Sequence, residues 1–312
     1  MVNIKAKQMA KPLTRKSAFV QNWDLYLIAI IGLLYLVVFK YLPMGGIAIA
    51  FQDFNLFDGI SGSPWVGLEN FKRLVGSADF YKVFRNPLLI SVYKLVFLFP
   101  LPIILALMLN EIRNMAFKKI TQTVIYIPHF LSWVVVAGIF TTLLSPSTGI
   151  INNVLAAMGF ERISFFTSNT WFRSVLVATA GWKESGWSAI IFIAAIAGVD
   201  QELYEAAYMD GAGRFKQMLH ITLPGISSTI VLMLILKLGQ ILDVGTEQVL
   251  MMYNPTVYDT GDVISSYVYR MGLGKMEYSF STAVGLFNSV IGLILVVSGN
   301  YLSKKFTGSS IW

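Results

Sequence analysis

The chain has 312 residues, of which 55% are hydrophobic and only 13% are charged. Soluble domains carry about 25% charged residues because water must wet their surface, so much of this chain's surface must face something other than water, and lipid is the simplest candidate. The net charge is +7, but the basic residues are not gathered on a stripe or arm that could track phosphates, which argues against nucleic-acid binding. The absence of cysteine excludes disulfides and thiolate metal sites.

Six apolar stretches have about the 20 residues that an α-helix needs to cross ~30 Å of hydrocarbon. They cover residues 25–42, 87–109, 123–144, 172–198, 226–242 and 281–302. Pro100 and Pro102 remove backbone donors from the second stretch and should kink it.

The first stretch has the basic flank of a signal peptide, but it is longer than a typical signal core and no A-x-A-like cleavage site follows. We therefore expect a retained helix there, and an all-α integral membrane protein with six transmembrane helices.

The basic residues predict the orientation of these helices. They gather in the short segments that lie inside if the N-terminus is inside: Lys5, Lys7, Lys11, Arg15, Lys16, Arg113, Lys118, Lys119, Arg214, Lys216, Lys304 and Lys305. By the positive-inside rule both termini are cytoplasmic. The chain then divides into a basic N-terminal segment (1–24), a first helix with its outer loop (25–86), a transmembrane core (87–302) with an inner loop at 199–225, and a tail (303–312).

The outer loops contain structured stretches of their own. The second, 145–170, has a helix-like stretch near 150–158. Such a stretch is compatible with an element at the membrane interface, with a lid, and equally with a simple connector.

The inner loop at 199–225 is unusual in its chemistry. Asp200 can cap a helix, and the acidic residues after it suit the positive end of the helix dipole. Gly211 and Gly213 permit a sharp turn. Apolar residues then recur at helical spacing before Pro224 ends the segment: Phe215, Met218, Leu219 and Leu223. The pattern predicts two short helices joined at a glycine turn, which fit either a partner's groove or the lipid surface.

One motif in this loop carries a resemblance. It reads Glu205-Ala206-Ala207, three residues, Gly211, nine residues, Ile221, one residue, and Leu223-Pro224. This spacing is the signature of bacterial binding-protein-dependent ABC importer permeases, the MetI-like type I importer family. Asp210-Gly211-Ala212 also resembles the carbohydrate branch of that family.

Further stretches resemble the LplB-type permeases for polysaccharides or oligosaccharides. They are Tyr41-Leu42-Pro43-Met44-Gly45-Gly46, Phe51-Gln52-Asp53-Phe54-Asn55, Gly67-Leu68-Glu69-Asn70-Phe71, Leu109-Asn110-Glu111-Ile112-Arg113, Pro128-His129-Phe130-Leu131-Ser132-Trp133-Val134-Val135 and Gly181-Trp182-Lys183-Glu184. The resemblance implies a MetI-like permease core over 87–302, a place in a bacterial cell membrane, and import of a saccharide.

The resemblance also implies how such a chain is driven. The inner loop would be a coupling helix seated in a cleft of a cytoplasmic ATPase, with coupling residues Glu205, Ala206, Ala207, Asp210, Gly211, Ile221, Leu223 and Pro224. Because the sequence has no G-x-x-x-x-G-K-[ST] loop, we expect no cofactor in this chain and expect a partner to bind ATP and Mg. The implied partners are a second homologous permease, two ATPase subunits, an external solute-binding (lipo)protein, the sugar and membrane lipid.

Polar and aromatic residues within the apolar stretches are candidates for the solute pathway, because an ionisable group there is costly. The candidates are Lys94, Trp133, Lys183, Glu184, Trp187 and Asn288, with Lys237 and Trp182 as further possibilities. The lysines would suit an acidic polymer. Alternatives stay open for each: a lysine can snorkel to the interface, a tryptophan can mark the interface belt, and Glu184 can bond to the second permease.

Two other classes of protein fit the sequence less well. A secondary transporter or channel would have more than six spans or matched inverted halves, and it would have no use for a coupling loop. A membrane enzyme would need paired carboxylates, a metal cluster or a nucleophile–base spacing, and none is apparent; His129 and His220 lie in different segments, so a histidine metal site is not expected.

Overall fold

The computed structural model describes residues 22–307, so the predicted segment 1–24 and tail 303–312 fall mainly outside the described residues. Within that part the regular structure is helical, and the one β-type pairing is a bridge between Gln52 and Trp65. The α-helices are α2 (Trp23–Leu36), α3 (Gly59–Gly62), α4 (Glu69–Gly76), α5 (Ala78–Leu98), α6 (Pro100–Glu111), α7 (Met115–Tyr126), α8 (Trp133–Leu143), α9 (Ile150–Ala157), α10 (Phe172–Ala197), α11 (Gln201–Met209), α12 (Arg214–Gln217), α13 (Leu223–Gly225), α14 (Ser227–Gly239), α15 (Thr246–Met252), α16 (Tyr258–Gly261), α17 (Ile264–Tyr269) and α18 (Tyr278–Thr307). The 3-10 and π turns are η1 (Val37–Tyr41), η2 (Leu42–Phe51), η3 (Ile127–Phe130), η4 (Met218–Thr222), η5 (Pro255–Val257) and η6 (Arg270–Gly274).

The apolar helices coincide with the six predicted stretches. Three are long and apolar enough to cross a membrane by themselves: Trp23–Phe51, Ala78–Glu111 and Tyr278–Ser298. Three bent pairs pass the same test together, which raises the number of spans to as many as six: Met115–Phe130 with Trp133–Leu143, Phe172–Ala197 with Gln201–Met209, and Arg214–Gly225 with Ser227–Gly239. The prediction of an all-α, multi-span protein is thus confirmed.

A short interruption and not a sharp bend lies where the prolines of the second stretch begin, because Ala78–Glu111 counts as one span. The helix is interrupted at Phe99, directly before Pro100, and α5 itself starts at Ala78, well ahead of the predicted start at residue 87. Pro87 lies inside α5. The sequence pattern missed the early start because the first turns of α5 alternate apolar residues with charged ones and so form no continuous apolar run.

The third stretch was wrongly predicted as one continuous helix. In the structure α7 and η3 end at Phe130, and α8 leaves at an angle of 103°. Leu131 and Ser132 are extended, with ψ of 140° and 155°, and the Ser132 side chain caps α8 by accepting a hydrogen bond from the Val135 amide. Pro128 and the serine cap together stop one helix and start another.

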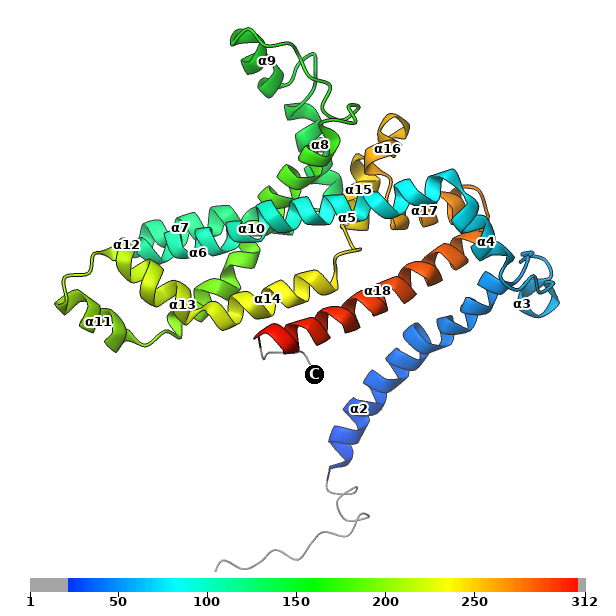
Figure 1. The fold of residues 1–312 in the computed structure, drawn as a ribbon, viewed down its shortest axis with the longest axis horizontal. Coiled ribbons are helices and arrows are strands. Elements are labelled where there is room, and N and C mark those ends of the chain that lie inside the picture. Colours follow the sequence, from blue (N-terminus) through cyan, green and yellow to red (C-terminus); the bar gives the residue numbers. More distant parts are fainter. Residues whose placement is uncertain (1–21, 308–312) are drawn as a thin grey trace, which may run out of the picture.

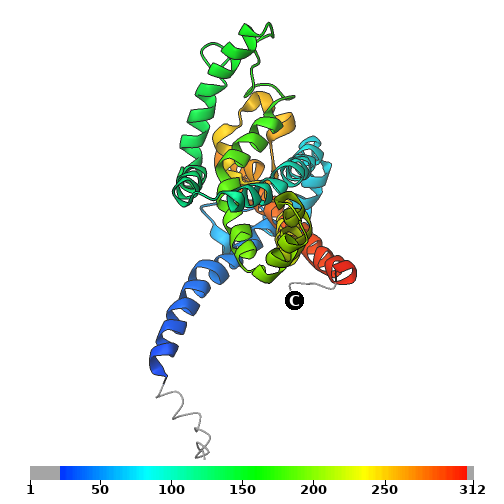
Figure 2. The same cartoon turned by 90° about the vertical axis from the view of Figure 1, so that its left-hand side faces the viewer.

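The helices form a bundle with two projecting elements (Figure 1). α5, α6 and α7 run along the long axis, α10 crosses behind them obliquely, α14 and α18 lie beside them, and α11 with α12 and α3 with α4 occupy opposite ends. α2 leaves the bundle on one side, and α8 with α9 leaves it on another, as the turned view in Figure 2 confirms. We call residues 133–163, which include α8 and α9, the arm.

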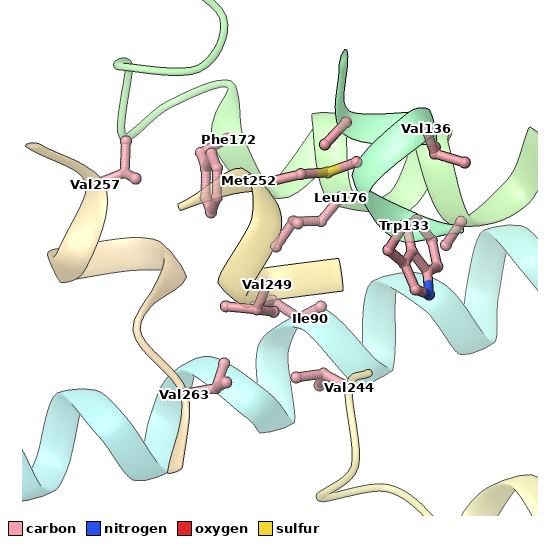
Figure 3. Packing of buried hydrophobic residues seen from close by; sticks show 12 residues of the cluster. Ile90, Trp133, Val136, Phe172, Leu176, Val244, Val249, Met252, Val257 and Val263 are labelled. Atoms are coloured by element: carbon pink, nitrogen blue, oxygen red, sulfur yellow. The ribbon is translucent and has the colours of Figure 1, made fainter. Parts of the chain in front are cut away.

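The largest hydrophobic cluster lies where the arm joins the bundle (Figure 3). It brings together side chains from α5, α8, α10, α15 and the segments beside α15 and α16, among them the fully buried Ile90, Phe172 and Leu176. A second cluster, which we call the lower cluster, joins α6, α10 and the start of α14 through Ile103, Phe192 and Ile226 among others. These clusters fix α10 between the other helices.

Gly261 in α16 offers a test of the first cluster. A Cβ at this position would lie 2.2 Å from the Phe172 ring, which is fully buried and has no room to move. We expect Gly261→Ala to destabilise the protein by about 1–3 kcal/mol through overpacking. Thermal unfolding in detergent measures the loss. Gly285→Ala in α18 is the control, because its Cβ would meet nothing within 4 Å, and an equal loss in both variants would contradict the packing shown here.

Candidate functional site

The loop at 199–225 begins with a capped helix that ends at a glycine. The Asp200 side chain accepts a hydrogen bond from the Glu202 amide at 3.0 Å, which confirms the predicted cap of α11. At the other end the amide of Ala212 donates to the Ala207 carbonyl at 2.8 Å, and the amide of Gly211 donates to Tyr208 at 3.0 Å. This pair of bonds is a Schellman motif, and it requires the left-handed conformation that Gly211 adopts, with φ +75°.

The second half of the loop packs back onto the bundle. Tyr204 and Thr222 share a hydrogen bond of 2.9 Å between their hydroxyls, which ties α11 to η4. Met218, Ile221 and Leu223 pack against the lower cluster. The helix continues past Pro224 to Gly225 and bends by 58° before α14, so Pro224 does not end it as the sequence suggested. An exposed ion pair of 3.4 Å joins Arg214 to Glu111 at the end of α6.

The outer face of the loop is exposed and mixed in character. Glu205, Ala206, Asp210 and Gly211 are exposed. Large apolar side chains lie beside them: Leu203, Tyr208, Met209 and Phe215, of which Met209 is 83% exposed. The loop therefore has an inner side that packs on the bundle and an outer side with exposed apolar surface, and it lies at one end of the molecule (Figure 1).

A cavity of about 280 Å³ lies between α5, α6, α10 and α14. Its ionisable side chains are Lys94, Glu184, Lys237 and Asp243, and its hydroxyl groups are Ser91, Ser185 and Ser188. The side chains of Glu184 and Lys237 form no hydrogen bond or ion pair with any residue in the part of the chain that the structure describes. The cavity can therefore offer both donors and acceptors to a polar solute.

Irregular backbone between α14 and α15 forms one wall of this cavity. Lys94 holds this segment: its Nζ donates to the Val244 carbonyl and to Gln248 Oε1, both at 2.7 Å. Gln248 is fully buried and donates onward to the Leu176 carbonyl at 2.6 Å and to Thr179 Oγ1 at 2.8 Å. The amine of Lys94 is thus hydrogen-bonded to the cavity wall. Lys237 lines the cavity, and its amine has no hydrogen-bond or ion-pair partner among residues 22–307.

A second cavity of about 370 Å³ lies beyond the same segment, toward α17 and α18. Gln240, Ile241 and Asp243 line both cavities. Asn288 of α18 lines the second, and its Oδ1 is buried with no hydrogen-bond partner in the described part of the chain.

Comparison with known proteins identifies the chain. Residues 99–308 match the family model described as "Binding-protein-dependent transport system inner membrane component". The chain belongs to this family. The permease is 49% identical to protein LplB of Bacillus subtilis (strain 168) over 95% of this chain and 93% of that protein. It is 48% identical to the polygalacturonan/rhamnogalacturonan transport system permease protein YteP of the same organism, over 94% and 91% of the two chains.

Solved structures agree with the sequence comparison. The permease fold matches a chain of a bacterial ABC transporter involved in the import of the acidic polysaccharide alginate, with a TM-score of 0.85 and 41% identity over 93% of this chain and 98% of that chain. The alginate transporter bound to its alginate pentasaccharide-bound periplasmic protein matches with the same TM-score and 39% identity, over 94% and 98% of the chains. The MetI-like permease fold and the multi-pass bacterial membrane location are therefore shown.

The predicted pathway residues of the permease separate into three places. Lys94 and Glu184 line the first cavity and Asn288 lines the second. Trp133, Lys183 and Trp187 gather at the break between η3 and α8 and line neither cavity. Their part in solute passage stays a prediction.

Sequence reasoning missed Gln240, Asp243 and Gln248. Gln240 lies near the end of the predicted stretch 226–242 and Asp243 directly follows it, and Gln248 is a polar residue in a short helix whose buried face includes Val249 and Met252. The nearby Gly245, which adopts φ +86°, is the one local signal of irregular backbone at this point.

The turn at Gly211 leads to a direct prediction. Alanine would have to adopt the left-handed conformation, at a cost of about 1 kcal/mol, so Gly211→Ala should loosen the end of α11. Hydrogen–deuterium exchange of a peptide covering residues 204–213 should become faster. Gly213→Ala is the matched control, since Gly213 is extended with φ −69° and has open space around it. Equal exchange in both variants would refute the Schellman assignment.

Proposed function

We propose that the permease forms part of the membrane pathway by which an ABC importer carries an oligosaccharide or polysaccharide into the cell. Support comes from the family match and from relatives whose names specify saccharide transport. The observation that carries the proposal is the first cavity, because its serine hydroxyls, carboxylates and free ammonium group match the hydrogen-bonding needs of a hydroxyl-rich solute.

The loop at 199–225 is the proposed contact with a separate ATPase subunit. Its outer face combines exposed apolar side chains with Glu205 and Asp210, and its inner face is packed on the bundle, so a partner can move it as one body. Glu205, Ala206, Ala207, Asp210 and Gly211 would touch the ATPase. Ile221 and Leu223 would serve by holding the loop to the bundle, and Pro224 would lie in the last turn before the bend.

The proposed assembly contains this permease, a second homologous permease, two ATPase subunits and an external solute-binding protein. One solved relative was captured with its solute-loaded periplasmic protein, which supports the last of these. Both termini would be cytoplasmic, on the side of the coupling loop. ATP and Mg would be bound by the ATPase subunits, because this chain has no phosphate-binding loop.

The proposed solute is an acidic saccharide. YteP and the alginate transporter are named for polymers of acidic sugars. In the permease, Lys237 is the lysine free to meet a carboxylate, whereas Lys94 already donates to Val244 and Gln248. Glu184 and Asp243 would accept hydrogen bonds from sugar hydroxyls.

Reversing the charge of Glu205 tests the proposed coupling contact. Glu205→Lys should leave the complex assembled in the membrane but separate ATP hydrolysis from uptake, because the loop would no longer fit its partner. Both rates can be measured in proteoliposomes that contain the complete transporter. Glu161→Lys is the control, since Glu161 is an exposed residue of the arm and far from the loop in sequence. Full coupled transport by the Glu205 variant would argue against docking at this face.

Neutralising Lys237 tests the proposed solute class. Lys237→Gln should raise the KM for an acidic oligosaccharide about tenfold, the equivalent of one charge-assisted hydrogen bond of about 1.5 kcal/mol. Uptake of the same oligosaccharide with its carboxyl groups reduced to alcohols should be unchanged. Lys275→Gln, at an exposed lysine outside both cavities, is the control. An equal change for both solutes would contradict recognition of the carboxylate.

A further inference from the structure

The break between η3 and α8 leaves backbone carbonyls without helical partners. A helix end has up to four such carbonyls, and within an apolar span no water is present to satisfy them. Here the Lys183 amine supplies the missing donors: Nζ donates to the carbonyl of His129 at 2.6 Å and to that of Leu131 at 2.7 Å. Lys183 is only 8% exposed, so the two carbonyls and the Trp133 ring, 5.5 Å away, form its surroundings.

The same face of α10 holds the break at two more points. Gly186 and Trp187 follow Lys183 by three and four residues, so the three lie on one face of the helix. A Cβ at Gly186 would lie 2.0 Å from the Ile125 carbonyl oxygen, which shows how closely α7 approaches α10. The Trp187 ring stacks on the His129 ring with centroids 4.5 Å apart and planes 1° apart. This face of α10 is therefore complementary to the bent segment formed by α7 and η3.

The arm beyond the break is itself a connected unit. Asn152 of α9 is fully buried, and its Nδ2 donates to the carbonyls of Leu144, Ser145 and Ile163 at 3.0–3.1 Å. These bonds tie α9 to the end of α8. α8 packs against the bundle through Trp133, Val136 and Ala137, with Phe140 beside them against Trp182, so this packing and the contacts at the break together hold the arm. A change of angle at Leu131 would therefore carry α9 with it.

We propose that Lys183 is a positioning residue that sets the angle between α7 and α8, and with it the direction of the arm, and that it does not bind solute. A buried ammonium group in an apolar span is costly, and here that cost is offset by its hydrogen bonds to the two carbonyls at the break. The adjacent Glu184 faces the first cavity, so two neighbouring charges on α10 have separate tasks. This inference rests on the proposed function, because the direction of the arm matters only if the permease transports a solute.

The direction of the arm can be measured directly, because the chain contains no cysteine to interfere with spin labelling. Labels on Val92→Cys in α5 and Val154→Cys in α9, both at exposed positions, report the distance from bundle to arm in the assembled transporter with cysteine-free partners. Lys183→Met removes every donor and should shift and broaden this distance. Lys183→Gln keeps two N–H donors and should give a smaller shift. Lys275→Met should give none.

Uptake and ATP hydrolysis supply the second readout. We expect Lys183→Met to reduce uptake several-fold with unchanged ATP hydrolysis in the absence of solute, and Lys183→Gln to recover part of the loss. If the methionine variant does not assemble, the glutamine variant alone decides the result. Unchanged distances in the variants, or a displaced arm with full uptake, would overturn the proposal. A wild-type complex without ATP-driven saccharide uptake would instead refute the proposed function, and the distances would still decide the role of Lys183.

Discussion

The structure depends on how it satisfies backbone groups where apolar helices break. A break inside a span exposes carbonyls that lipid cannot solvate, so a side-chain donor must reach them. Lys183 does this for two carbonyls between η3 and α8. Lys94 does the same for Val244 in the irregular segment that follows α14, just beyond the end of the fifth span. Each lysine lies within a regular α-helix, α10 or α5, and donates to irregular backbone of another segment.

α10 shows how one helix can serve several of these needs. Its face with Lys183, Gly186 and Trp187 lies against the break in the third span. The face with Glu184 and Ser188 lines the first cavity. Its first turns bury Phe172 and Leu176 in the main cluster, next to the Thr179 hydroxyl that accepts a hydrogen bond from Gln248. A continuous helix of 26 residues is what allows a brace, a cavity wall and a core element to keep fixed positions relative to one another.

The sequence predicts those features that depend on local pattern. Apolar length located every span, and the Asp200 cap and the Gly211 turn follow from side-chain chemistry within a few residues. The break at Leu131 was not predicted because apolar residues continue on both sides of it. The side chain that donates to its carbonyls, Lys183, is more than fifty positions away in the sequence. Sequence distance therefore hides which carbonyls Lys94 and Lys183 contact, and their part in solute passage stays a prediction.

The motif at Glu205–Pro224 also separates into two kinds of residue once it is folded, and this separation bears on the proposed coupling. Glu205 and Asp210 are exposed, whereas Ile221 and Leu223 pack on the lower cluster. Phe192 belongs to that cluster and also lines the first cavity, as do Phe99 and Met233 at its edge. Because a packed core does not deform continuously, a displacement of the loop must shift these shared side chains. The proposed ATPase contact and the cavity are therefore joined by direct packing, without any intervening flexible element.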